Sequence, residues 1–246
     1  MMSDCRWIWP RDRREPNLHL LIRRDLDVAV GGDLRIDLAV ESAAEIWIDQ
    51  VRIGRTAANS YPGQHYVESF TAPVAAGRRR LALVVRYIGI PGTSSIPKDP
   101  GLLARVTLPD GTTVPSDATW VWRDLDAWRG RLRRSEWFNL DLIEICDRRR
   151  LPTGFPCVED LAGFAVPEVL PSPGVRFTGL EPRPFPKPVD TGAVALRLIQ
   201  TGSVVDLAAD HAIPAQAMSH ETISTAPLDW DGRTLVLPAV QTGRAW

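Results

Sequence analysis

Apolar and polar side chains alternate along much of the chain. In residues 34–40, LRIDLAV, every second side chain is apolar, and Arg35 and Asp37 lie between the apolar positions. Residues 79–87, RRLALVVRY, repeat this pattern. A period of two residues is typical of a strand that has one buried face and one solvated face. The sequence therefore predicts antiparallel sheets, which often face water on one side.

Turn signals separate these strand-like segments. Residues 45–54, EIWIDQVRIG, favour a strand, a turn and a second strand. Residues 102–116 carry an Asp110-Gly111 pair between two strand-like runs, which is a hairpin signal. Further strands are expected at residues 18–28, 119–125, 194–200 and 203–209.

Helical periodicity is nearly absent. It is best developed in residues 124–138, where Leu125, Trp128 and Leu132 would form a short apolar stripe. We expect less than about a tenth of the residues in α-helix, well below the usual third. Short strands broken by glycine and proline predict an all-β fold, a jelly roll or β-sandwich rather than a parallel α/β sheet.

Proline marks the predicted domain organisation. The chain has 21 prolines, and residues 170–190 are especially rich in them, which favours a stiff, extended connector. We predict a β-domain at residues 1–155, a proline-rich connector at 156–190 and a second β-rich piece at 191–246. A sandwich needs about seven strands, and the last piece carries fewer. We therefore expect an incomplete second sandwich, in a chain that is a fragment or a split product.

Composition excludes several classes of protein. Of the 246 residues, 44% are hydrophobic and 24% charged, and the net charge is -1, so the basic excess that nucleic acids and anionic membranes attract is missing. No stretch approaches the roughly 20 apolar residues of a membrane-spanning helix. The three cysteines lack metal-type spacing and are odd in number. We expect a reduced, cytoplasmic protein.

Motifs for catalysis are missing as well. The sequence contains neither the Gly-x-Ser-x-Gly of a nucleophile elbow nor a phosphate-binding glycine loop, and its four histidines lack the grouping of metal ligands. Carboxylates are frequent in residues 136–147, but nothing brings two of them across a sugar, as glycoside hydrolysis requires. We predict no catalytic residue and no metal ligand.

The nine tryptophans leave one class of ligand open. Sugars stack on exposed aromatic rings, so tryptophan and tyrosine beside polar loops can form a carbohydrate platform. Trp7 with Trp9 and Trp120 with Trp122 are spaced to share a face, and we interpret both pairs mainly as core or seam residues.

A weaker candidate for a ligand patch lies in the middle of the first domain. Trp47 is expected on the face that also carries Asp49, opposite Ile46 and Ile48, and the polar segment at residues 59–66 follows closely. The predicted sugar-binding residues are Trp47, Asp49, Asn59, Tyr61, His65 and Tyr66.

Several segments, in order, resemble the N-terminal region of the bacterial α-L-rhamnosidases of glycoside hydrolase family 78. They are WIWP, LIRRDL, AEIWIDQVRIG, QHYVESFTAP with VAAGRRRLALVVRYIG, GLLARVTLPDGTTVPSDATWVW, LIEICDRRRLPTGF and LEPRPFP. The order and spacing of these segments carry the resemblance, which extends over essentially the whole chain. The sequence departs from the pattern at Asp49-Gln50, where the family favours Asn-Gly, and at Phe155, where it tends to have Trp.

The resemblance implies a galactose-binding-like jelly roll that aids substrate recognition, followed by a further β-sandwich. In the family, the catalytic carboxylates belong to a later α/α toroid, and this sequence holds no part of it. The implied function is a non-catalytic accessory region that supports a catalytic toroid and contacts a rhamnose-containing glycan. The alternatives are a free-standing carbohydrate-binding module, or a chain classed as an α-L-rhamnosidase through its parent enzyme. No cofactor is implied, and a structural calcium ion has no support in the sequence.

Overall fold

The computed structural model describes residues 2–56, 64–90, 96, 98–129, 145–170, 179–184 and 186. The chain divides into two compact units, of which the first contains Met1–Leu125 with Pro152–Val189 and the second contains Asp126–Leu151 with Asp190–Trp246. Most of the described residues belong to the first unit.

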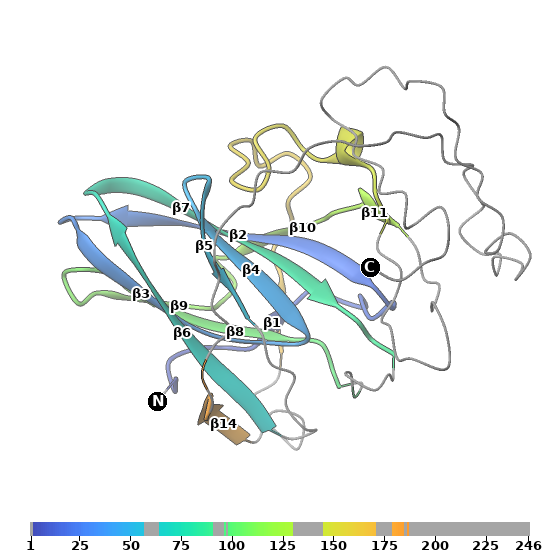
Figure 1. Ribbon diagram of the computed structural model, residues 1–246, viewed down its shortest axis with the longest axis horizontal. Coiled ribbons are helices and arrows are strands. Elements are labelled where there is room, and N and C mark those ends of the chain that lie inside the picture. Colours follow the sequence, from blue (N-terminus) through green and yellow to red (C-terminus); the bar gives the residue numbers. More distant parts are fainter. Residues whose placement is uncertain are drawn as a thin grey trace, which may run out of the picture. The chain divides into compact units, whose positions relative to one another are not determined.

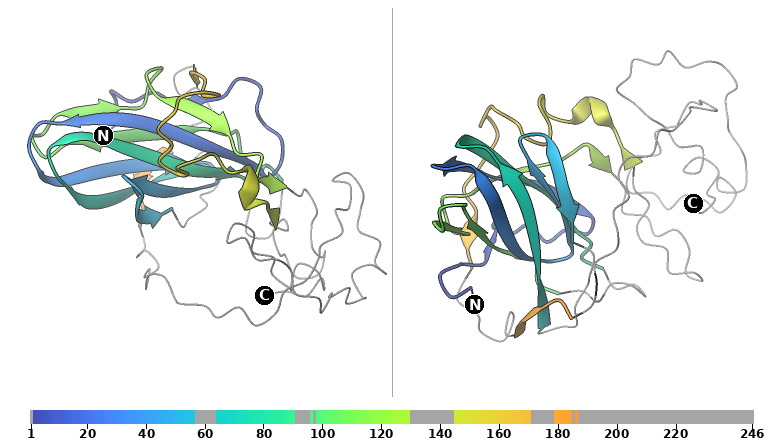
Figure 2. Two further views of the ribbon diagram at one scale, coloured as in Figure 1. Left: turned by 90° about the horizontal axis from the view of Figure 1, so that it is seen from above. Right: turned by 60° about the vertical axis from the view of Figure 1, so that its left-hand side comes forward.

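The first unit is a β-sandwich of two sheets (Figures 1 and 2). The strand order of sheet A is β13 (Glu168–Val169), β1 (Ile8–Trp9), β8 (Leu102–Thr107), β3 (Gly32–Val40), β6 (Gln64–Val74) and β14 (Gly179–Pro182), with β9 (Thr113–Pro115) beside β8. The order of sheet B is β10 (Val121–Asp124), β2 (Leu18–Val28), β7 (Gly77–Tyr87), β4 (Ala43–Ile48) and β5 (Val51–Arg55). This confirms the predicted all-β class.

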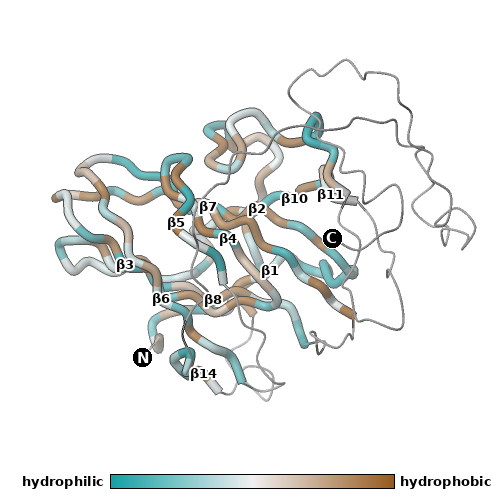
Figure 3. Tube along the Cα trace, in the orientation of Figure 1, coloured by the Kyte–Doolittle hydropathy of each residue, from teal (hydrophilic) through white to brown (hydrophobic). Residues whose placement is uncertain are grey.

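The core lies between the two sheets and follows the predicted alternation. Leu34, Ile36 and Leu38 of β3 enter it from sheet A, and Leu81 and Leu83 of β7 enter it from sheet B. All five side chains have an exposed fraction of 0%. Figure 3 shows the corresponding apolar stretches along the strands. The period of two in the sequence therefore corresponds to strands with one face in the core and one face outside it.

The longest strand pair joins β2 to β7. Its antiparallel register runs from Leu18 opposite Tyr87 to Val28 opposite Gly77. The predicted hairpin at Asp110-Gly111 is also present: β8 pairs with β9, and the Leu108 carbonyl accepts a hydrogen bond from the Gly111 amide at 2.9 Å.

Residues 124–138, where the helical periodicity is best developed, form no helix in their described part. Asp124 ends the strand β10, and β11 (Trp128–Arg129) pairs with β12 (Ile145–Cys146) in the second unit. Strand pairing thus overrides the short apolar stripe, because helical propensity is a weak prior. The helical element of the described residues is a single 3-10 turn, η1 (Arg148–Arg150), which Asp147 caps by accepting from the Arg149 amide.

Residues 152–170 form a segment that we call the strap. It lies on the outer face of sheet B, where the Arg23 guanidinium donates to the carbonyl oxygens of Val158 and Glu159 at 2.9 and 3.0 Å. Further along, Ala165 exchanges backbone hydrogen bonds with Trp122 of β10, and β13 pairs with β1 of sheet A. The strap therefore ties an edge strand of one sheet to an edge of the other.

The strap overlaps the start of the expected connector. The expected connector covers residues 156–190, and of these, residues 156–170 and 179–184 contact the sandwich through backbone hydrogen bonds. Proline is compatible with such contacts at sheet edges, where a missing amide donor costs little. The second β-domain predicted at 191–246 lies outside the described residues and stays a prediction, as does the three-part division.

Gly54 of β5 allows the two sheets to approach each other closely. A β-carbon built at this position would lie 2.9 Å from two ring carbons of Phe70, which is 7% exposed in the core. We expect Gly54→Ala to lower the free energy of unfolding by about 1–3 kcal/mol, because a buried aromatic ring has little room to move. Urea denaturation measures this. Val51→Ala, at an exposed position of the same strand, serves as the control, and equal effects of the two substitutions would contradict this packing.

Candidate functional site

The turn between β4 and β5 is the first component of the candidate site. Asp49 and Gln50 have φ angles of 45° and 71°, as a two-residue type I′ turn requires. Asn-Gly is the favoured sequence for this turn, because residues with a β-carbon avoid positive φ and asparagine and aspartate tolerate it best. Gln50 therefore carries local strain that neighbouring contacts must offset.

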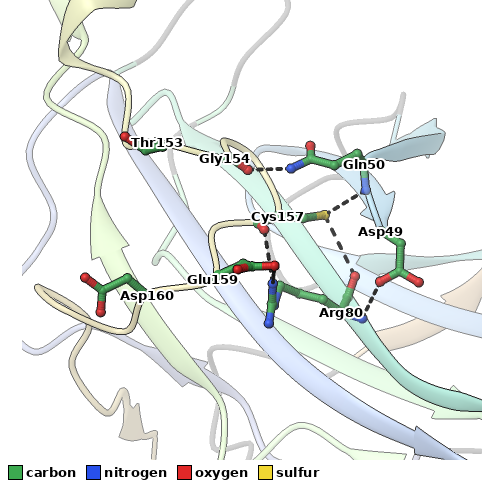
Figure 4. A pocket seen from close by; sticks show the side chains of 8 residues that line it. All are labelled: Asp49, Gln50, Arg80, Thr153, Gly154, Cys157, Glu159 and Asp160. Carbon is green, nitrogen blue, oxygen red and sulfur yellow. Dashed lines mark hydrogen bonds and ion pairs between the residues drawn. The ribbon is translucent and has the colours of Figure 1, made fainter.

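Contacts on both sides hold the turn (Figure 4). Asp49 accepts hydrogen bonds from the Arg80 amide at 2.9 Å and from the Arg79 guanidinium at 3.2 Å. The Gln50 amide donates to Cys157 Sγ at 3.2 Å, and the Gln50 side chain donates to the Gly154 carbonyl at 2.5 Å. Both carboxylate oxygens of Asp49 thus accept hydrogen bonds from within the protein, so Asp49 stabilises the turn.

Cys157 anchors the strap beneath the turn. Its side chain is buried, and burial raises the pKa of the thiol above its ordinary value, although the hydrogen bond from the Gln50 amide opposes this. The protonated thiol can donate to the Arg80 carbonyl, 3.8 Å away, while it accepts from Gln50. Because the thiolate is the reactive form, this arrangement makes Cys157 a structural residue.

The turn and the strap border an open cleft of about 460 Å³. Its lining residues, drawn in Figure 4, are Asp49, Gln50, Arg80, Thr153, Gly154, Cys157, Glu159 and Asp160. Three of the eight come from sheet B and five from the strap. The cleft therefore exists only because the strap is folded onto the sheet.

A charged network behind the cleft fixes the Arg80 side chain. Asp25 on the neighbouring strand β2 binds Arg23, Arg78 and Arg80, with N–O distances of 2.8, 2.6 and 3.2 Å. Burial alone would raise the pKa of Asp25, but hydrogen bonds from Arg23 and Arg78, together with the charges of Arg23 and Arg80, lower it to about 2. Arg80 also donates to the Cys157 carbonyl at 3.3 Å.

The mouth of the cleft combines a fixed cation with exposed acceptors. The side chain of Glu159 is 92% exposed, and its Oε1 lies 4.0 Å from Arg80 Nη1, too far for a hydrogen bond. Asp160 and Thr153 add a carboxylate and a hydroxyl group to the lining. Such a set of groups can both donate to and accept from a polar ligand.

Two observations on the described residues concern metal ligands and buried carboxylates. Within those residues, no three His, Cys, Asp or Glu side chains are arranged to hold a metal ion. Burial raises the pKa of Glu41, although the Lys98 ammonium 2.8 Å away opposes this. The Glu41 side chain is only 3% exposed and is ion-paired, so no sugar can reach it.

Four of the six predicted sugar-binding residues are described, and they are divided between the two sheets. Trp47 and Asp49 share the outer face of sheet B as expected, opposite Ala82 and Arg80 of β7. Asp49 lines the cleft, whereas Trp47 is half-buried and is not part of its lining. Asn59 and Tyr61 lie outside the described residues.

His65 and Tyr66 lie on β6 of the other sheet. His65 is buried at 2% exposure and packs on Trp7, with ring centroids 4.9 Å apart. Successive side chains of a strand point to opposite faces, so Tyr66 points away from His65. The outer faces of sheets A and B lie on opposite sides of the sandwich, which separates His65 from Trp47.

The paired tryptophans are packing residues, in agreement with their interpretation as core or seam residues. Trp7, Trp9 and Trp120 are 4%, 2% and 0% exposed, and Trp122 packs partly against the core. The expectation that Trp7 and Trp9 share a face is wrong, because Trp9 enters the main core and Trp7 a second cluster with Met2. Trp7 precedes the two-residue strand β1, so the alternation does not extend to it.

Comparison with known proteins supports the fold. No protein-family model matches the sequence, and no curated protein matches it. Among solved structures, the chain is similar to the GH78 family rhamnosidase of Bacillus sp. GL1, with a TM-score of 0.65 and 23% identity over 76% of this chain and 20% of that one.

Two further rhamnosidases show the same likeness. The α-L-rhamnosidase of Dictyoglumus thermophilum gives a TM-score of 0.56 and 14% identity over 76% of this chain and 23% of that one. The native α-L-rhamnosidase of Aspergillus terreus gives a TM-score of 0.51 and 17% identity over 74% of this chain and 23% of that one. The chain thus spans about a fifth of the length of these structures, and at such identities the likeness establishes a shared fold.

The charged network predicts a specific pH dependence of stability. The pKa of Asp25 is about 2 in the folded protein, against an ordinary value of 3.8, so its ionised form stabilises the fold above pH 3.8. The contribution, about 2 kcal/mol at most, is lost as the pH falls from about 4 towards 2.

We expect the stability difference between the unsubstituted chain and Asp25→Asn to be constant near neutral pH and to shrink across this acid window. Urea denaturation at a series of pH values measures it. Asp27→Asn is the matched control on the same strand, because Asp27 makes none of the three arginine contacts. A difference that stays constant down to pH 2 would show that the network does not depress the pKa of Asp25.

Proposed function

We propose that this chain is a non-catalytic accessory region of a rhamnosidase-like glycoside hydrolase, which contacts carbohydrate and supports a catalytic domain. The observation that carries the proposal is the fold likeness to three rhamnosidases, which extends over about three quarters of this chain but a fifth of theirs. A region that matches so small a part of each enzyme suits a supporting role.

The chemistry of the described residues fits a role without catalysis. Hydrolysis of a glycoside needs an acid and a base or nucleophile on opposite sides of the scissile bond, and the acid needs a raised pKa. Glu41 has a raised pKa, but it is buried against Lys98. Glu159 and Asp160 are neighbours in sequence on the strap, and Asp49, the lining carboxylate on the turn, already accepts hydrogen bonds from the Arg80 amide and the Arg79 guanidinium.

The cleft suits the hydroxyl groups of a sugar. A hydroxyl donates one hydrogen bond and accepts others, so neighbouring hydroxyls can donate to Glu159 or Asp160 while they accept from Arg80. Asp25 holds the Arg80 guanidinium in place before a ligand arrives, which lowers the entropic cost of binding. No aromatic ring lines the cleft, so we expect weak binding with a Kd of about 1 mM.

The proposed partner is the catalytic domain, and the proposed setting is reducing. Cys5 and Cys157 are buried, and burial, with the nearby Asp4, raises the pKa of Cys5 to about 12. Thiols of this kind are unreactive and fit a cytoplasmic protein. In the described part of the chain no helix is long and apolar enough to cross a membrane.

Titration of the isotope-labelled chain with L-rhamnose, followed by NMR, tests the carbohydrate contact. We expect saturable shifts at Arg80, Gly154 and Glu159, with a Kd of about 1 mM. Glu159→Gln combined with Asp160→Asn should weaken binding roughly tenfold, since the amides keep the shape but remove the charge.

The matched control is Asp33→Asn, an exposed carboxylate on β3 of the other sheet, and it should leave the affinity unchanged. The absence of saturable shifts in the cleft, or equal effects of both substitutions, would refute the assignment. Saturable shifts from another monosaccharide in place of L-rhamnose would favour a carbohydrate-binding module of different specificity.

A further inference from the structure

β14 is an unusual strand for its place in the sandwich. It is parallel to β6, with Leu180 opposite His65 and Pro182 opposite Val67, and it forms the edge of sheet A. Figure 1 shows it in orange beside the start of β6. The pairing continues for one residue beyond the strand, because the Arg183 amide donates to the Val67 carbonyl at 3.2 Å. Parallel pairs of this length have few hydrogen bonds to fix their register.

The prolines of this segment leave the strand able to donate backbone hydrogen bonds along one edge only. Proline alternates with other residues in LEPRPFPKP, at positions 182, 184, 186 and 188. Successive amides of a strand point to opposite edges, and the Arg183 amide points to β6, so those of residues 182 and 184 would point away. Proline removes both donors from the outer edge only. The strand can therefore pair with β6 and has a blunted outer side.

A buried ion pair joins this strand to its partner. Arg183 Nη1 lies 2.7 Å from Glu68 Oε2, and the two side chains are 7% and 2% exposed. Glu68 stands opposite Leu38 in the register of β6 and β3. The Arg183 guanidinium also donates to the Pro186 carbonyl at 3.0 Å. The pair thus connects the end of the docked strand to the interior of the sandwich.

A buried ion pair is an expensive way to gain stability. The desolvation cost of two charges can exceed their attraction, and well-packed apolar residues often stabilise the same site equally well. The best-attested use of such a pair is to specify one register among several. Few hydrogen bonds fix the register of a short parallel strand with prolines at alternate positions, so its register requires a further interaction such as an ion pair.

We infer that residues 179–183 are a docking strand for the open edge of β6, and that the Arg183–Glu68 pair sets its register. The occupant of this edge is the chain's own segment, and the pair fixes which residue of that segment lies opposite each residue of β6. The inference goes beyond carbohydrate binding and holds whatever ligand the cleft takes.

Hydrogen exchange in the full chain tests the register. In Glu68→Gln we expect the Arg183 amide to exchange about tenfold faster than in the unsubstituted chain, while amides of the β2–β7 pair keep their protection. The matched control is Glu45→Gln, which removes a half-exposed ion pair with Arg52 on sheet B and should leave Arg183 unaffected. Unchanged exchange at Arg183 in Glu68→Gln would overturn the inference.

A double variant separates register from stability. In Glu68→Met combined with Arg183→Met, apolar side chains fill the site, and we expect the thermal midpoint to return close to that of the unsubstituted chain. The amide of residue 183 should nevertheless stay as exchangeable as in Glu68→Gln, because apolar contacts do not select one register. Full recovery of protection in the double variant would show that the pair only fills space, and the inference would then fail.

Discussion

The eleven-residue pairing of β2 with β7 is the constraint on which the remaining structure depends. Its register places Leu20 opposite Val85 and Ile22 opposite Leu83 in the core. The same register places Asp25 opposite Arg80 on the outer face. A slip of one residue would exchange the two faces, bury the charges and expose the core, so the apolar alternation specifies this register strongly.

The outer face that this register creates must be covered, and the strap covers it. Arg23 is 3% exposed, and its guanidinium is satisfied by Asp25 and by the carbonyl oxygens of Val158 and Glu159. A buried guanidinium without these acceptors would be strongly destabilising. The contacts that neutralise Arg23 also bring Glu159 and Cys157 to the β4–β5 turn. The cleft is thus a consequence of how the sandwich buries its arginines.

The pattern of apolar and polar residues predicts the strands, but it does not predict the strap. The alternation in residues 34–40 and 79–87 and the Asp110-Gly111 pair predicted real strands and a real hairpin, because these signals are local. The strap has no periodicity, since backbone carbonyls and a thiol make its contacts, and these are invisible in a pattern of apolar residues. Gln50 meets Cys157 from a distance of 107 residues along the chain, and Arg23 meets Val158 from 135. Among the described residues of the predicted patch, Asp49 lines the cleft, whereas Trp47 of the same sheet is not part of the lining. His65 and Tyr66 belong to the other sheet.

The proposed role combines these features into an accessory region: a β-sandwich, a cleft at one turn and a strand docked on the edge of β6. The central claim is that this region contacts carbohydrate and supports a catalytic domain but does not itself hydrolyse glycosides. The most direct test is prolonged incubation of the purified chain with an aryl α-L-rhamnoside, with release of the aryl alcohol followed against buffer. The account predicts release at the rate of the uncatalysed reaction. Turnover above that rate, abolished by a single Asp or Glu substitution within residues 2–186, would contradict it.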